Sequence, residues 1–481
     1  MSSLRKNAVS GIVWTYGQQF SVQIISFIIS IILTRLLLPA EYGIIGLLAI
    51  FIAVGTALSN GGLASSLIRT PNLTPKDYST VFVFNLAGSV LIYIILYFAA
   101  PYIAEFYKVP VLVSVTRVYC LSFIFSAFGA VQNTLLTKEM KFKQLTFINL
   151  PAMILSSILG VALAFYNFGV WSLVYMYLAK SLITAVMLHI LSPYKVSFIF
   201  DKEIFKKHFA FGSKIAASSI IDSVFGNFYL MIIGKMYSPV QVGYYSRSDS
   251  LMMLPVANIS IALNSVVFPL FSKVQHETLR LKQMYRKILL MILFIITPMM
   301  LIMIVLAKPI VIVLFSVKWV EIVPIFQILC LTGILYPIHS YNLIILEVTG
   351  KSGLYLKVSV LKKILMVGVI LATLPFGFYA LLWGQVGYSV LSLFINMFFA
   401  GELINYKMIR QFLDILPIFA YGFLMYIGIY FLEKTVSDWN NFSQILVVSC
   451  VGLVIYLVVS KLSKSESLNT IIELIKERKL N

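Results

Sequence analysis

The hydrophobic pattern of this chain is a series of apolar runs of about twenty residues that follow one another along all 481 residues. A helix needs about 20 apolar residues to cross a bilayer hydrocarbon core of about 30 Å. A soluble domain buries one core and does not repeat such runs. The pattern therefore predicts an all-α integral membrane protein with fourteen spans, near residues 10–34, 42–62, 78–100, 113–136, 144–166, 169–191, 211–234, 242–271, 286–306, 321–346, 355–374, 377–400, 413–432 and 443–461.

A short segment between the first two apolar runs returns once, two hundred positions later. Residues 34–43 and 234–243 carry a base, a proline and a glycine at the same three offsets. Proline starts a turn, glycine lets the next helix begin close to its neighbour, and a base marks the membrane edge. Proline and glycine are also common in unrelated loops. Because each copy joins the first two helices of a six-helix block, we predict two six-helix lobes in a parallel repeat.

This repeat suggests a division of the chain into five parts. The expected parts are an N-terminal six-helix lobe (1–191), a cytoplasmic amphipathic linker (192–210), a C-terminal six-helix lobe (211–400), two additional transmembrane helices (401–462) and a cytoplasmic amphipathic tail (463–481). Within the linker, Asp201 can cap a helix whose apolar and basic residues lie on different sides.

Composition and charge placement agree with a membrane protein. The chain is 60% hydrophobic and 11% charged, so its net charge of +19 does not indicate a nucleic-acid partner. Most Lys and Arg residues fall in the predicted cytoplasmic segments, which predicts that both termini are cytoplasmic. The predicted outer loops hold only Arg35, Lys108, Lys235, Lys308, Lys318 and Lys434.

Several kinds of site are not expected. The three cysteines lie inside apolar runs without a C-x-x-C spacing and the four histidines are scattered, so neither a metal site nor a bound cofactor is predicted. The first run lacks a small-residue cleavage site and should remain as a membrane helix. No predicted outer loop exceeds about fifteen residues, which leaves no platform for an enzyme acting on the outer face.

Polar residues inside the spans are the best functional signal. A charged side chain at the bilayer centre costs about 2.5–3.5 kcal/mol, so such residues normally face a lumen or a partner. In the first span, Gln19 and Gln23 share a narrow arc with two serines, which suits either cavity lining or hydrogen bonding between helices. Asp222, in the seventh span, could titrate, pair with a base or bind a cation, and we take it as the candidate for ion coupling.

Bases outnumber acids inside the spans, which suits an anionic passenger such as a pyrophosphate headgroup. Lys362 and Lys363 lie nearer the cytoplasmic side, where snorkelling explains them equally well. Tyr244 and Arg247 share a face, and Asp249 lies close to them. With the two glutamines, the candidate cavity residues are therefore Arg117, Lys180, Tyr244, Arg247, Asp249, Lys362 and Lys363.

Several stretches resemble one family, the polysaccharide-transporter (oligosaccharide flippase) family, and in particular its branch linked to lipopolysaccharide and exopolysaccharide export. The resemblance runs through most of the chain and is clearest from about residue 5 to 365. It is carried by LLLPAEYG (36–43), LLTKEMKF (135–142), GVWSL (169–173), IGK (233–235), GYYSR (243–247) and VFPLFSKVQ (267–275).

The resemblance implies the MATE-like fold of the MOP superfamily, with two six-helix lobes around a central cavity and here two extra helices. It also implies a multi-pass protein of the bacterial inner membrane. Its substrate would be a polyprenyl-pyrophosphate-linked oligosaccharide, which alternating access moves from the cytoplasmic to the periplasmic leaflet. A polysaccharide polymerase and chain-length machinery would be its partners, besides membrane lipids. The family has no single motif from which site residues can be carried over.

Three other functions remain open at this stage. A lipid-precursor flippase for peptidoglycan would share the fourteen-helix plan. A drug or cation antiporter of the same superfamily would use an acidic residue, which Asp222 could supply, coupled to a proton or sodium gradient. A membrane polysaccharide polymerase or ligase would need a large outer loop, which the sequence lacks.

Overall fold

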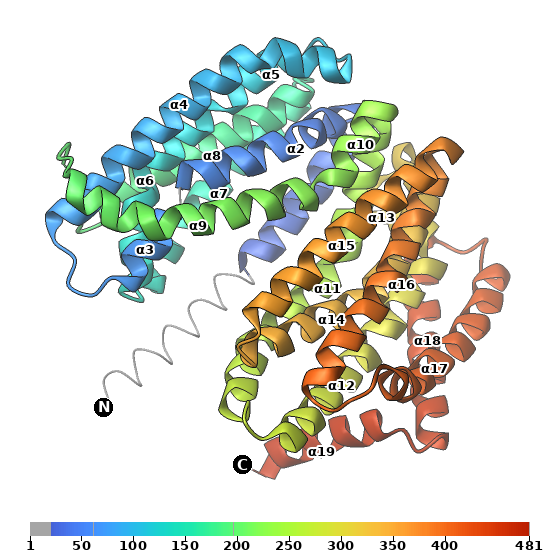
Figure 1. The fold of residues 1–481 in the computed structure, drawn as a ribbon. Coiled ribbons are helices and arrows are strands. Elements are labelled where there is room, and N and C mark those ends of the chain that lie inside the picture. Colours follow the sequence, from blue (N-terminus) through green and yellow to red (C-terminus); the bar gives the residue numbers. More distant parts are fainter. Residues whose placement is uncertain (1–20, 61, 196, 481) are drawn as a thin grey trace. The chain divides into compact units, whose positions relative to one another are not determined.

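The computed structural model of this chain describes residues 21–60, 62–195 and 197–480. Within these ranges the chain forms α-helices, two short 3-10 helices and connecting turns, with no strand (Figure 1). The predicted all-α class is therefore confirmed. The contacts between residues divide the chain into two compact units, unit 1 with residues 1–243 and unit 2 with residues 244–481.

Unit 1 is a bundle of long apolar helices. Within it α7 packs along α8, α6 packs on α8, α4 packs on α6, and α9 lies across α2 and α3. Its helices are Ser21–Leu36, α2 (Pro39–Asn60), α3 (Leu63–Arg69), α4 (Pro75–Tyr107), α5 (Leu112–Tyr119), α6 (Leu121–Lys138), α7 (Phe142–Phe165), α8 (Val170–Leu191), α9 (Lys202–Gly226), α10 (Phe228–Met236) and the first residues of α11 (Pro239–Lys273).

The predicted cap at Asp201 is confirmed. Its Oδ1 accepts hydrogen bonds from the backbone N–H groups of Glu203 (2.9 Å) and Ile204 (3.1 Å). The capped helix is longer than expected, because α9 continues from the linker into the seventh predicted span and bends by 44° before α10. At this bend the Asn227 side chain donates to the Ser223 carbonyl (2.9 Å), an alternative to the helical hydrogen-bond pattern.

The observed contact boundary after Gly243 differs from the lobe boundary expected in residues 192–210. The difference arises because α9 and α10 pack on helices of unit 1. The five-part division of the chain stays a prediction.

The two copies of the repeated segment begin their helices in the same way. Pro39 is the first residue of α2 and Pro239 the first of α11. The Glu41 carboxylate accepts the Leu38 N–H (2.7 Å), and the Gln241 amide oxygen accepts the Ser238 N–H (3.1 Å). In each copy the side chain of the third helix residue thus accepts a hydrogen bond from the backbone N–H just before the helix.

The glycines of the two copies pack against each other within unit 1. A Cβ atom at Gly43 would overlap the carbonyl oxygen of Pro239, and one at Gly243 would overlap the carbonyl oxygen of Pro39. Only glycine allows two backbones to approach this closely. The predicted role of these glycines, a close start of the next helix, is confirmed by this reciprocal contact.

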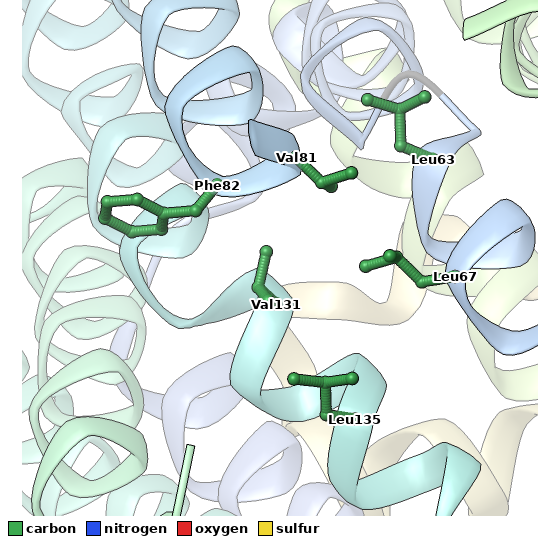
Figure 2. Packing of buried hydrophobic residues seen from close by; sticks show 6 residues of the cluster. All are labelled: Leu63, Leu67, Val81, Phe82, Val131 and Leu135. Atoms are coloured by element: carbon green, nitrogen blue, oxygen red, sulfur yellow. The ribbon is translucent and has the colours of Figure 1, made fainter. Parts of the chain in front are cut away.

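An apolar cluster fixes α3 against α4 and α6. Leu63 and Leu67 of α3 meet Val81 and Phe82 of α4 and two residues of α6, Val131 and Leu135, all at most 3% exposed (Figure 2). Leu63 and Leu67 are four residues apart and therefore lie on one side of α3. Ser65 and Ser66, between them, are left for other contacts.

Unit 2 has the remaining helices. In it α14 packs along α16, α12 packs on α14 and α17, and α17 packs on α18. Its elements are the rest of α11, α12 (Thr278–Val305), α13 (Ala307–Phe315), a 3-10 helix (Val317–Ile322), α14 (Val323–Val348), α15 (Ser352–Thr373), a second 3-10 helix (Leu374–Phe376), α16 (Phe378–Leu403), α17 (Met408–Thr435), α18 (Asn441–Leu462) and α19 (Glu466–Leu480).

A charged cluster joins three elements of unit 2. Arg286 of α12 donates to Asp414 of α17 through Nε (2.8 Å) and to Glu466 of α19 through both terminal nitrogens (2.6 and 2.8 Å). The Tyr406 hydroxyl also donates to Asp414. The guanidinium is thus shared between two carboxylates, a geometry that suits its planar fork of donors.

Eleven helices of the described part are long and apolar enough to cross a membrane, or twelve if the bent pair of α9 and α10 is one span. The shorter apolar helix Ser21–Leu36 and α11 match two more of the predicted spans but are outside this count. A multi-pass membrane protein is confirmed, whereas the number of fourteen spans stays a prediction.

Candidate functional site

A cavity of about 670 Å³ lies inside unit 1. Helices α2 to α9 all contribute to its wall. Half of the residues that line it carry a hydroxyl or an amide, although the surrounding helices are apolar, and one more, Lys180, carries an ammonium group. The residues with a hydroxyl or an amide are Thr56, Ser65, Asn85, Tyr119, Ser122, Ser126, Asn133, Thr134, Asn149, Tyr177, Ser181, Thr184 and Ser219.

Two helices contribute regular polar stripes to this wall. On α6, Ser122, Ser126 and Asn133 follow each other at intervals of four and seven residues, which places them on one helical face. On α8, Tyr177, Lys180 and Thr184 repeat at intervals of three and four. A polar stripe on a membrane helix needs polar partners or water, and here both stripes face the same cavity.

Glycine allows α9 to close one side of the cavity. Gly62, between α2 and α3, has a φ of +64°, and a Cβ atom there would overlap the carbonyl oxygen of Gly212 on α9. Both the left-handed conformation and the close approach require glycine at this position. The α9 residues that follow, Ile215 and Ser219, then reach the cavity.

Lys180 is the one lining residue with a formal charge at neutral pH, and no Asp or Glu is among the lining residues that the structure describes. It lies near the middle of α8 and is exposed toward the cavity. No carboxylate of the described residues forms an ion pair with it. The cavity is therefore polar and cationic, and it can accept an anion together with several hydroxyl groups.

Aromatic rings lie beside these polar groups. The rings of Tyr119 and Tyr177 are 5.6 Å apart between centroids, and both residues line the cavity. Phe123 and Phe125 also line it. Such a combination of flat apolar surface and hydrogen-bonding groups is typical of small-molecule sites.

The structure places the predicted residues of unit 1 in different surroundings. Lys180 lines the cavity. Arg117 does not, because its guanidinium lies over the Tyr97 ring at 4.2 Å and its Nε donates to the Tyr97 carbonyl (3.3 Å). Gln23 is half-buried on the first helix, and Gln19 is outside the described residues. Asp222 is exposed near the end of α9 and is not a lining residue.

The other predicted residues belong to unit 2. Tyr244 packs edge to face on Trp319, with 6.2 Å between ring centroids. Arg247 and Asp249 are half-buried on α11, and Lys362 and Lys363 are half-buried on α15. Their role as cavity residues stays a prediction.

The uncharged part of the lining was not predicted from the sequence. The signal was available, because Ser122, Ser126 and Asn133 form the same kind of polar stripe that singles out Gln23 on the first helix. A lone serine in a span has many structural uses, however, and only the packing shows which stripe faces a cavity.

Comparison with known proteins identifies the family. A family model described as "Polysaccharide biosynthesis protein" matches residues 32–324. The chain is 24% identical over 372 residues to the teichuronic acid biosynthesis protein TuaB of Bacillus subtilis, covering 74% of each protein. It is 22% identical over 379 residues to the lipopolysaccharide biosynthesis protein WzxC of Escherichia coli, covering 76% of this chain and 75% of the relative.

Solved structures share the fold. The lipid II flippase MurJ, in an inward closed conformation, superimposes with a TM-score of 0.76 at 14% identity, covering 94% of this chain and 98% of that one. An inward-facing multidrug resistance transporter of the MATE family gives a TM-score of 0.64 at 17% identity, covering 80% and 94% of the two chains. These similarities confirm the expected MATE-like fold. Since the family model also spans more than half of the chain, this protein belongs to the polysaccharide biosynthesis protein family.

Proposed function

We propose that this protein is a flippase that moves a polyprenyl-pyrophosphate-linked oligosaccharide from the cytoplasmic to the periplasmic leaflet by alternating access. It is a transporter and not an enzyme. The observation that carries the proposal is the cavity of unit 1, whose lining combines many hydroxyl and amide groups with one cation and no carboxylate. The relatives that act in polysaccharide biosynthesis and the fold shared with a lipid II flippase support it.

The uncharged lining suits an oligosaccharide. A sugar loses hydrogen bonds to water when it enters a membrane, and each unmade bond costs about 1–3 kcal/mol. Side chains such as Ser126, Asn133 and Thr184 can both donate and accept, so they can replace water around sugar hydroxyls. Tyr119 and Tyr177 offer flat surface for the apolar face of a sugar ring.

The cation suits the pyrophosphate. An anion that crosses the bilayer centre needs a compensating charge, and Lys180 lies near the middle of α8 without an ion-pair partner among the described residues. A lysine ammonium binds phosphate oxygens through charge-assisted hydrogen bonds. The polyprenyl chain is apolar and can stay in the bilayer while the headgroup moves.

The placement of charge supports the rest of the proposal. We propose the bacterial inner membrane as the location and the cytoplasm as the side of both termini, because the predicted cytoplasmic segments hold most Lys and Arg residues. Arg247, Lys362 and Lys363 remain candidates for further contacts with the anionic carrier. A polymerase and chain-length machinery are proposed as the partners that receive the flipped units.

The antiporter alternative fits the cavity less well. A cationic drug would need a carboxylate, and none is among the described residues that line the cavity. Asp222 is the acidic residue that this alternative would use, and it is not a lining residue.

The proposal is tested by the sidedness of lipid-linked repeat units in a strain from which the gene is deleted. Intact cells are treated with a sugar-modifying probe that cannot cross the inner membrane, and opened cells provide the total amount of the units. We expect the units to accumulate where the probe reaches them only in opened cells, and complementation with the wild-type gene to restore modification in intact cells. Normal modification in intact deletion cells would show that another protein flips the units.

A further inference from the structure

A buried cluster of three polar side chains lies beside the cavity in unit 1. His208 of α9 is 0% exposed. Its Nε2 lies 3.1 Å from Asp77 Oδ1 at the start of α4, and its Nδ1 lies 2.8 Å from Ser66 Oγ of α3. Both ring nitrogens are therefore engaged, and the imidazole ties three helices together.

The partners fix where the protons are. A carboxylate can only accept, so the neutral imidazole carries its hydrogen on Nε2 and donates it to Asp77. Nδ1 then accepts the hydrogen of the Ser66 hydroxyl. A second proton can bind Nδ1, which then donates to Ser66 Oγ, because a hydroxyl oxygen can also accept. The imidazole can thus take up one proton and keep both of its contacts, with Asp77 and with Ser66.

Asp77 is held in the charged form that this uptake needs. Its Oδ2 accepts the backbone N–H of Thr74 (2.9 Å) and the Thr74 hydroxyl. A protonated His208 would form a buried ion pair with this carboxylate, and the pair would already have its hydrogen bonds.

The other charged groups around α9 are engaged elsewhere or lie on other parts of their helices. Lys138 of α6 donates to the backbone carbonyls of Leu67 (2.9 Å) and Thr70. Arg69 lies over the Phe211 ring at 4.6 Å. On α9 itself Lys206 pairs with Glu203 (2.8 Å). The other charged residues of this helix are Lys202, Lys207, Lys214 and Asp222. The remaining charged residues on the helices that pack against α9 are Glu41 of α2, Lys76 and Glu105 of α4, and Lys235 of α10.

The cluster is connected to the cavity through two helices. Ser65 lines the cavity and is the neighbour of Ser66, while Ile215 and Ser219 of α9 line it two to three turns beyond His208. Between them the backbones of Gly62 and Gly212 are in direct contact. A shift of α9 caused by protonation of His208 would therefore move the cavity wall, because the close contact of Gly62 and Gly212 leaves no space to absorb it.

We propose that His208, with Asp77 and Ser66, is a proton-binding site linked to the cavity, so that binding of the anionic headgroup is accompanied by uptake of a proton. This inference rests on the proposed flippase function, because it needs an anion in the cavity. An anion stabilises a nearby positive charge, and by linkage a bound proton strengthens binding of the anion by the same factor. The added positive charge then offsets part of the negative charge of the headgroup while the headgroup is inside the membrane.

The test measures binding of a polyprenyl pyrophosphate to the purified full-length protein between pH 6 and pH 8. The titration of the probe itself is common to all variants and cancels in their comparison. We expect the wild type to gain at least about fivefold more affinity on going from pH 8 to pH 6 than the variant His208→Gln. Titration calorimetry in two buffers of different ionisation enthalpy should also show proton uptake by the wild type and less by the variant.

Three controls separate the outcomes. His276→Gln removes an exposed histidine of unit 2 and should keep the wild-type pH profile. If His208→Gln does not yield folded protein, Asp77→Asn replaces it, and this variant should show a smaller pH dependence of binding than the wild type, because the carboxylate that would pair with the protonated ring is lost. A pH profile of His208→Gln or Asp77→Asn identical to that of the wild type overturns the proton site. Failure of the wild type to bind the probe at any pH would instead count against the flippase function.

Discussion

Lys180 in unit 1 and Arg286 in unit 2 are both cations on long apolar helices, but their surroundings are opposite. Arg286 is shared between Asp414 and Glu466, and its donors are occupied by the protein itself. Lys180 faces a cavity that lacks a carboxylate among its described lining residues. A cation whose partners are built into the fold stabilises that fold, whereas a cation left facing a polar cavity is available for a ligand. Within one chain, Arg286 therefore serves stability and Lys180 serves binding.

The largest effect is expected for Arg286→Ala, which tests whether Arg286 stabilises the fold. The change leaves the half-buried Asp414 without its ion-pair partner, and breaking a buried pair in this way costs about 3–5 kcal/mol. We expect a large drop in the thermal stability of the detergent-solubilised protein. Arg280→Ala is the matched control, because Arg280 forms an exposed pair with Glu277 and its loss should cost less than about 1 kcal/mol. Equal stability of the two variants would contradict a structural role for Arg286.

The second prediction concerns Gly43, whose contact with Pro239 leaves no room for a side chain. In Gly43→Ala the added Cβ meets a backbone carbonyl that cannot rotate away, and such overpacking should cost about 3 kcal/mol. The readout is again thermal unfolding in detergent. Gly368→Ala in unit 2 provides the control, since nothing lies within 4 Å of a Cβ there and alanine favours the helix. A Gly43 variant as stable as this control would mean that the contact between the two copies is not required.

Lys180→Gln should lower binding affinity and leave thermal stability unchanged, whereas Arg286→Ala should lower thermal stability. Loss of a charge-assisted hydrogen bond worth about 1.5–3 kcal/mol should weaken binding of polyprenyl pyrophosphate about tenfold to a hundredfold. Thermal stability should stay near that of the wild type, because no ion pair of the described residues is lost. Lys195→Gln removes the same charge from an exposed loop of unit 1 and should bind normally. An unchanged affinity of the Lys180 variant would move the anion site away from this cavity.

The smallest expected effect is that of Ser126→Ala in the cavity wall. A single neutral hydrogen bond contributes about 0.5–1.5 kcal/mol, so transport of the complete lipid-linked oligosaccharide should fall about two- to tenfold. Binding of polyprenyl pyrophosphate without sugar should not change, because this side chain is proposed to contact the glycan. If binding of polyprenyl pyrophosphate fell together with transport, Ser126 would contact the headgroup instead of the glycan.

The sequence was sufficient where a residue type has one dominant physical use. Asp201 before an amphipathic segment predicts a cap, and proline and glycine at matched offsets predict two helix starts with close backbones; both are observed. Lys180 could be found because a charged residue in an apolar run is unusual whichever way its helix is rotated.

The sequence was insufficient where the outcome depends on how a helix is rotated against its neighbours. Arg117, like Lys180, is a cation inside a predicted span, yet it packs on Tyr97 outside the cavity lining. The hydroxyls of α6 and the pairing of His208 with Asp77 depend on contacts between helices far apart in sequence. The bend at Asn227 was also missed, because a continuous apolar run does not reveal a side chain that competes for a backbone carbonyl.

The reciprocal contact of Gly43 and Gly243 has a consequence for biosynthesis. The first glycine enters the membrane early, but its partner emerges two hundred residues later, after about 10–40 s of translation. Until then Gly43 lacks its contact with Pro239. Unit 1 can reach its final packing only once the second copy of the segment, at the very end of this unit, has been made.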